Sequence, residues 1–149
     1  MKSIFLIGFL AIYIPAFAQK KHRIIFTPPV LGMEYPDFMD ACELPTHKNQ
    51  LVYTRFVYSG IEEYWGLSPE KKCNNINADL SISDSVVIKA EDLKNIKYVH
   101  SHYWNKYLII DLIGTFDDSN QKGYGHLGSN NSRFIVKYVI ATYVVDKNR

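Results

Sequence analysis

The sequence has little excess of charge of either sign. Its 17 basic and 15 acidic side chains leave a net charge of +2 among 149 residues. Binding of nucleic acid through a broad electrostatic field needs a larger basic excess, so we expect no nucleic-acid partner. The sequence also lacks any uncharged apolar run of the ~20 residues that a membrane-spanning helix requires. We therefore expect no stable membrane insertion of the mature chain.

The first eighteen residues have the pattern of a secretory signal peptide. Lys2 supplies the positive start, and an apolar run follows it at residues 4–14. Pro15 ends this run ahead of the small-residue stretch AFA, and we place the cleavage site after Ala18. We expect a secreted or periplasmic protein with one domain, in which an N-terminal segment, 19–50, precedes a β-rich domain, 51–149.

Cysteine is scarce, and the two cysteines lack the short C-x-x-C spacing that is typical of redox pairs and thiolate metal sites. Both lie in the part of the chain that we expect to be exported, where the surroundings are oxidising. We predict a disulfide between Cys42 and Cys73. Closing a loop of this length contributes ~3 to 4 kcal/mol on the loop-entropy account.

Hydrophobic periodicity in the β-rich domain predicts five strands and one helix. In chain order these are a strand at 51–60 that continues, coiled, past Gly60 to Trp65, a strand at 76–82, a short strand at 85–88, a helix over 89–99, and strands at 107–116 and 133–145. This is the element order of the OB-fold. We predict a mainly β protein, a small five-stranded OB-fold-like barrel with one short helix between strands 3 and 4.

The N-terminal segment predicts two smaller elements. RIIFTPPVLG, residues 23–32, is typical of an edge strand that its two prolines end, and PDFMDACEL, residues 36–44, indicates a turn of helix. Taken together, EYWGL, Cys73, LIGTF and YGHLG resemble a group of uncharacterised exported bacterial proteins with small OB-like barrels. The resemblance implies the fold and the compartment, but it supplies no catalytic residue because that group has no agreed activity.

The stretch GYGHLG, residues 123–128, matches the G-x-G-x-x-G pattern of dinucleotide-binding proteins. That pattern holds a pyrophosphate only where a helix begins directly after it, because the helix N-terminus supplies the backbone N–H groups. Here β-prone residues follow Gly128. We therefore expect no cofactor, and we interpret the glycines as a connection between two antiparallel strands that needs positive φ angles.

A second hypothesis assigns the chain to a different class of protein. His100, His102 and His126 could form a zinc site with an open position, which would make the protein a small metal-dependent hydrolase. The alternative is that these histidines are half-exposed loop residues. No G-x-S-x-G elbow is present, and the mid-strand Asp111 is more often paired with a lysine, an arginine or a tyrosine hydroxyl than catalytic.

Aromatic residues are abundant, with eleven tyrosines, eight phenylalanines and two tryptophans. The expected outer face at 76–83 carries asparagine, aspartate and serine, so it lacks the rings and the positive charge that bind single-stranded nucleic acid. The YW pairs at 64–65 and 103–104 could instead form a sugar or peptide platform. Our leading hypothesis is a non-enzymatic, exported binding or structural module that contacts an unknown ligand or an envelope protein through its barrel loops. The candidate residues are Trp65, Trp104, Tyr124 and His126.

Overall fold

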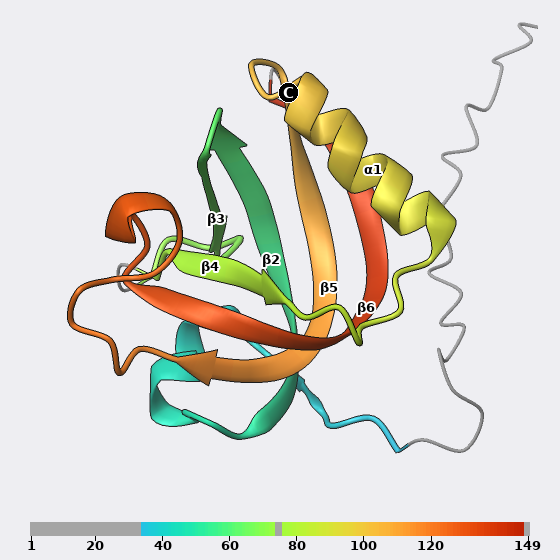
Figure 1. Ribbon diagram of the computed structural model, residues 1–149. Helices are drawn as coiled ribbons and strands as arrows, with labels where there is room; N and C mark the ends of the chain where they lie inside the picture. The colour runs from blue at the N-terminus through green and yellow to red at the C-terminus, as the bar shows by residue number, and fades with distance from the viewer. Residues whose placement is uncertain (1–33, 74–75, 148–149) are drawn as a thin grey trace, which may run out of the picture.

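A computed structural model describes residues 34–73 and 76–147. Within them the protein is mainly β, with a closed five-stranded barrel, a sixth strand outside the ring and one short α-helix (Figure 1). The elements in chain order are β1 (Phe38–Met39), the 3-10 helix η1 (Ala41–Thr46), β2 (Leu51–Ile61), β3 (Tyr64–Ser68), β4 (Ala78–Ile82), α1 (Ala90–Ser101), β5 (Lys106–Asp117), the 3-10 helix η2 (His126–Gly128) and β6 (Ser132–Asp146).

The barrel closes because β5 pairs with both β6 and β2. The strand order around the ring is β2-β3-β4-β6-β5, and all neighbours are antiparallel except β4 and β6, which are parallel. The helix α1 connects the third barrel strand to the fourth. This is the Greek-key order of the OB-fold, so the predicted fold class is confirmed.

Alternation along the strands fills the barrel interior. On β2 the even-numbered side chains from Val52 to Tyr58 are buried in or beside the main core, and the strand pairs with β5 over its whole first part. At the centre the rings of Phe56 and Phe134 meet edge to face at 5.1 Å, and neither is exposed. Burying each of these rings contributes about 2 to 3 kcal/mol, and both belong to the buried core cluster.

The predicted path past Gly60 is wrong. Instead of one coiled strand to Trp65, the chain turns at Glu62 and Glu63 and returns as β3, with Gly60 opposite Trp65. Glycine is needed there because a Cβ on Gly60 would lie 2.3 Å from the carbonyl oxygen of Tyr64. A left-handed φ of 54° at Glu62 completes the turn.

The predicted short strand at 85–88 is also wrong. This stretch is the connection from β4 to α1, and it starts with a turn in which the backbone N–H of Val86 donates to the carbonyl of Ser83 at 3.0 Å. The strand at 76–82 is therefore the third strand of the barrel and not the second. The two errors compensate each other in the strand count.

Two β-bulges bend β6 against β5. The register skips Ile140 between the pairs Asp111–Ala141 and Leu112–Val139, and it skips Lys137 between Tyr138 and Val136. Each bulge leaves one residue of β6 without a partner position on β5, which strengthens the local twist and re-aims the side chain. The long final strand that the sequence predicts is thus present, and it curls.

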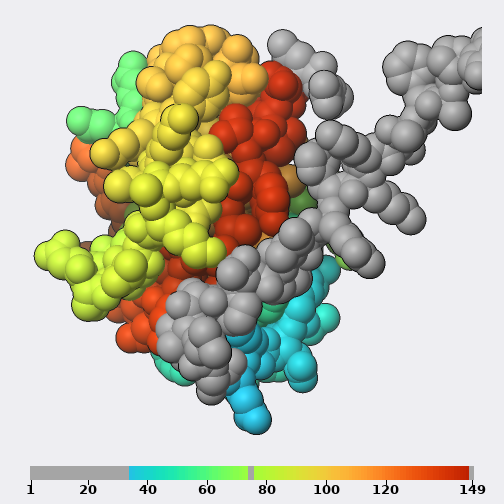
Figure 2. Space-filling model, turned by 90° about the vertical axis from the view of Figure 1, so that its right-hand side faces the viewer, coloured from blue at the N-terminus to red at the C-terminus, as the bar shows by residue number. Residues whose placement is uncertain are grey.

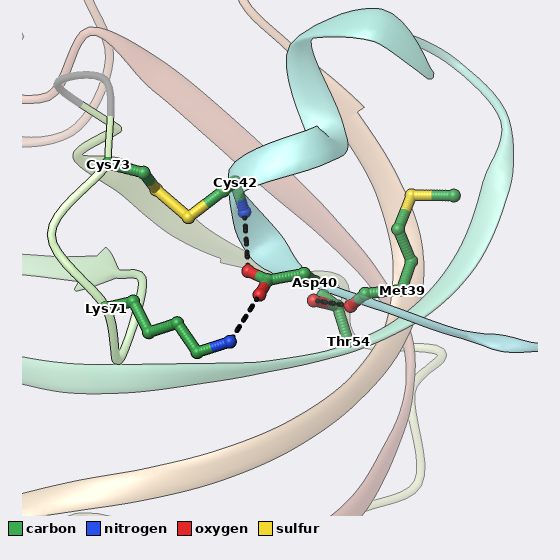
Figure 3. Close-up of a disulfide and its surroundings, with 6 residues drawn as sticks. All are labelled: Met39, Asp40, Cys42, Thr54, Lys71 and Cys73. Atoms are coloured by element: carbon green, nitrogen blue, oxygen red, sulfur yellow. Dashed lines mark hydrogen bonds and ion pairs between the residues drawn. A yellow bond between two sulfur atoms is a disulfide. The ribbon is translucent and has the colours of Figure 1, made fainter.

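The N-terminal part of the described chain is fastened to the barrel by a disulfide and by polar contacts (Figure 3). Cys42 in η1 is bonded to Cys73 in the connection from β3 to β4, as the sequence predicts. Asp40 accepts a hydrogen bond from the backbone N–H of Cys42 at 3.1 Å and contacts Lys71 at 3.3 Å. These two interactions hold the pKa of Asp40 below its usual value.

The predicted turn of helix at 36–44 corresponds to η1, and the strand outside the ring is β1, which runs parallel to β2. The edge strand expected at 23–32 lies outside the described residues. Within the described part of the chain, no helix has the length and apolar content that crossing a membrane requires.

Candidate functional site

The loop between β5 and β6, residues 118–131, carries GYGHLG and folds back on itself. The backbone groups of Tyr124 and Asn130 hydrogen-bond in both directions, at 2.8 and 3.1 Å. All three glycines of the motif have left-handed φ angles, 80° at Gly123, 68° at Gly125 and 71° at Gly128. The predicted glycine-rich connection is confirmed, because the three-residue η2 lies within the motif, at His126–Gly128, and the next element after Gly128 is the strand β6.

The 118–131 loop is anchored to β3 and to the residue that precedes β4. The side chain of Asn130, 2% exposed, donates from Nδ2 to the carbonyl oxygen of Trp65 at 3.0 Å. Further along, the backbone N–H of Asn131 donates to the carbonyl of Asn77 at 3.0 Å. Internal bonds and these anchors both constrain the backbone of the loop.

The loop brings His126 to the turn between β2 and β3. His126 Nε2 lies 3.2 Å from Glu63 Oε2, and the imidazole meets the ring of Tyr64 edge on, with 5.0 Å between centroids. Tyr64 remains 49% exposed. In an OB-fold these two loops flank the ligand-binding face, so the contact lies where the fold most often binds a ligand.

Tyr124, the neighbouring candidate, has a different role. Its ring is 9% exposed and lies under the guanidinium of Arg133, with 5.3 Å from Cζ to the ring centroid. Its hydroxyl accepts a hydrogen bond from the backbone N–H of Asn120 at 2.8 Å. Tyr124 therefore supports the loop from inside and offers little surface to a ligand.

Trp65 is the centre of an inner stack. Its ring lies 4.1 Å from the imidazole of His100 and 5.1 Å from the ring of Tyr58, and its Nε1 donates to the carbonyl of Glu62 at 2.7 Å. The Tyr58 hydroxyl is 2.9 Å from His100 Nε2. Burial raises the pKa of Tyr58 and lowers the pKa of His100, so at neutral pH the phenol keeps its proton and the imidazole is uncharged.

Trp104 belongs to an outer stack at the C-terminal end of α1. His102 lies over the ring of Tyr98 at 4.1 Å and 22°, and Trp104 follows at 5.6 Å. His102 Nδ1 is 2.8 Å from the carbonyl oxygen of Tyr98. A carbonyl only accepts, so Nδ1 carries the proton, and in the neutral ring Nε2 is an acceptor. Trp104 is 62% exposed.

These groups lie at one end of the barrel, where the tip of the β2–β3 hairpin and the C-terminal end of α1 both point upward in Figure 1. The contact between Trp65 and His100 connects the hairpin to the helix. We call this set of rings and the carboxylate beside them the aromatic rim. It consists of Tyr58, Glu63, Tyr64, Trp65, Tyr98, His100, His102, Trp104 and His126.

The three histidines of the zinc hypothesis do not form one site. His100 contacts Tyr58, His102 stacks on Tyr98, and His126 pairs with Glu63. Among the described residues, no group of three or more histidine, cysteine, aspartate or glutamate side chains could hold a metal ion.

Asp111 is paired, as the structural interpretation predicts. Arg55 lies opposite it on β2 and donates from Nε and a terminal nitrogen at 2.6 and 2.8 Å. Asp111 is 1% exposed, and its hydrogen bonds raise the pKa of Arg55. Both carboxylate oxygens of Asp111 are thus occupied by the guanidinium of Arg55, so the residue makes a structural contact between β2 and β5.

Two residues of the rim were missed in the sequence. Glu63 lies 63 positions before His126, and no local pattern joins them. Tyr98 could have been found, because it precedes His102 by four residues, the spacing at which side chains meet on a helix. Comparison of the chain with protein-family models, curated proteins and solved structures found no match.

Proposed function

We propose that the protein is an exported, non-enzymatic binding module that recognises a polyhydroxylated ligand, such as a glycan, through the aromatic rim. One observation carries the proposal: Tyr64 and Trp104, which are more exposed than the other tyrosine and tryptophan rings of the rim, are each packed against a histidine that a second contact holds in place. The disulfide and the signal-peptide pattern support export, because disulfides persist in oxidising compartments.

The chemistry of the rim favours a sugar over a nucleic acid. An exposed aromatic ring offers an apolar surface to the apolar face of a pyranose, while nearby polar groups bond its hydroxyls. The Glu63 carboxylate and His102 Nε2 supply acceptors beside the rings. Phosphate groups would instead meet the adjacent carboxylates of Glu62 and Glu63, which repel them.

The test is binding to a panel of neutral hexose and N-acetylhexosamine oligomers, followed by calorimetry with the best ligand. We expect Trp104→Ala and Tyr64→Ala each to weaken binding at least tenfold, since stacking rings act as binding hot spots. Phe38→Ala is the matched control, because Phe38 is 57% exposed on β1, away from the rim. It should bind as the unchanged protein does.

Other results would overturn the proposal that the ligand is a glycan. If no oligosaccharide binds but an envelope protein does, and the same two variants abolish that interaction, then the rim is a protein-binding surface. If neither rim variant affects any binding that is found, the proposed site is wrong. Tryptophan fluorescence offers a second measurement of binding at the rim. The chain has only two tryptophans, so the fluorescence of a Trp65→Phe variant comes from Trp104 alone.

A further inference from the structure

A second surface lies at the other end of α1 and is separate from the aromatic rim. It is a groove of about 480 Å³ between the β4–α1 connection and the bulged part of β6. Figure 2 shows the connection, in yellow-green, beside β6, in red. α1 has twelve residues and is therefore ~18 Å long, and the rim lies at its far end. The described lining residues are Ser83, Ser85, Val86, Val87, Lys89, Lys137, Tyr138 and Val139.

The groove has an apolar floor that continues into the barrel core. Val139 is 3% exposed and belongs to the main core, and Val86 packs against that core from the connection. Val87 stands at the edge of the groove with 88% of its surface exposed. A valine this exposed beside an apolar floor gains from a ligand that covers both.

The charges of the groove are all of one sign. Lys89 and Lys137 are its charged lining residues, and both are exposed. Neither forms a salt bridge within residues 34–73 and 76–147. Lys137 is the residue that the second bulge of β6 removes from the ladder, and Lys89 immediately precedes α1. Asp84 lies in the same connection but does not line the groove.

We propose that this groove binds a monomeric long-chain carboxylate, a fatty-acid-type amphiphile. Its chain would lie on Val86, Val87 and Val139, and its carboxylate would be held by Lys89 and Lys137. The volume is within the range of small-ligand sites, and an apolar floor with two cations at its edge complements an anionic amphiphile. This inference is independent of the proposed glycan binding at the aromatic rim.

The test is calorimetry of the purified protein with dodecanoate below its micelle concentration. We expect saturable binding, and shortening the chain to decanoate and octanoate should weaken it by up to ~4-fold for each methylene lost. Dodecyltrimethylammonium has the same chain and the opposite charge, so we expect it to bind at least tenfold more weakly. Equal binding of the two ions would overturn the proposal.

Variants locate the site. We expect the double variant Lys89→Met/Lys137→Met to lose at least tenfold in dodecanoate affinity and to keep its fold by circular dichroism, because both side chains are exposed. Lys97→Met, on the exposed part of α1 near its other end, is the matched control and should bind normally. An unchanged double variant would overturn the proposal. So would binding to phosphatidylglycerol vesicles without binding to monomeric dodecanoate, which would assign the groove to a lipid surface.

Discussion

The two ends of the barrel are built from different chemistry. At the end that carries η1 and β1, a disulfide and the contacts of Asp40 fasten the N-terminal part of the described chain (Figures 1 and 3). At the opposite end, rings stack on histidines, and two of the largest rings, Tyr64 and Trp104, remain exposed. The first arrangement constrains the chain, and the second presents a surface.

This difference indicates how stability and recognition are divided in a small domain. A covalent link stabilises chiefly by constraining the unfolded chain, so it makes little demand on the surface around it. Exposed aromatic rings contribute little to folding, since much of their area stays in water. Changes at the end that carries the disulfide should therefore affect the free energy of unfolding, and changes at the aromatic rim should affect ligand binding.

The largest effect that we predict is at the disulfide. Replacing both cysteines, Cys42→Ala/Cys73→Ala, removes a link across a sequence separation of 31 and should lower the free energy of unfolding by ~3 to 4 kcal/mol. Urea unfolding of the variant, and of the unchanged protein with and without reductant, measures this difference in the free energy of unfolding. At temperatures where the variant is folded, ligand affinity at the rim should be unchanged. Loss of rim binding in the folded variant would contradict the division between the two ends.

The next effect concerns the loop that supports the rim. Gly125→Ala places an L residue at φ 68° and ψ −162°, and its Cβ would lie 2.5 Å from Asn130 Nδ2. We expect a loss of about 2 kcal/mol in the free energy of unfolding, because only glycine adopts this conformation readily. Leu127→Gly is the control, because it makes the opposite change and puts glycine at a position where an L residue has a positive φ. Leu127 is 84% exposed at φ 51°, so glycine should leave stability unchanged or slightly raised.

A smaller effect appears in acid and tests the base of the same loop. Asp117 bonds Ser119 and accepts from Arg133 Nε at 2.9 Å, and these contacts lower its pKa to about 2. A carboxylate with a lowered pKa stabilises the fold above its unfolded pKa of 3.8, and this contribution disappears as the pH falls toward 2. After allowance for solvent screening we expect about 1 kcal/mol.

The measurement is the melting temperature of the protein and of Asp117→Asn between pH 2 and pH 6. The variant should be less stable than the unchanged protein at pH 6, and the two should converge as the pH approaches 2. A constant difference across this range would show that the variant loses packing or hydrogen bonds and that the charge of Asp117 is unimportant.

The fold could be predicted because the hydrophobic periodicity of the long elements identifies their order even when single short elements are assigned wrongly. Hydrophobic periodicity located β5, β6 and α1 closely, and these elements fix the OB-fold order. The turn at Glu62 and Glu63 was missed because neither residue is a typical turn former, and the only signal nearby, Gly60, indicated a bend within one strand. Residues 86–88 are β-branched, but the stretch 85–88 connects the barrel to α1, so tertiary context overrides its propensity.

The candidate site was predicted only in part, for a physical reason. Trp104 and His126 lie on the aromatic rim, as chain position and loop character suggested, whereas Tyr124 is buried by its own loop. The partners that define each environment, such as Glu63 for His126, come from distant parts of the chain. A single sequence contains no local pattern for contacts of that range.

The smallest effect that we predict distinguishes packing from hydrogen bonding inside the rim. Burial lowers the pKa of His100 below its ordinary 6.5, so the folded protein binds this proton less readily than the unfolded chain. Stability is then complete above pH 6.5 and decreases as the pH falls through the folded pKa. The melting temperature should decrease as the pH is lowered from 7 to 5, and the melting temperature of His100→Gln should decrease less over the same range.

Tyr58→Phe separates the two contributions to this behaviour. It removes the hydroxyl that lies 2.9 Å from His100 Nε2 but keeps the ring that packs on Trp65. Because burial lowers the pKa of His100, the dependence on pH should remain while the melting temperature drops by a similar amount at every pH. If the pH dependence disappears in Tyr58→Phe, the hydrogen bond and not burial controls the proton on His100.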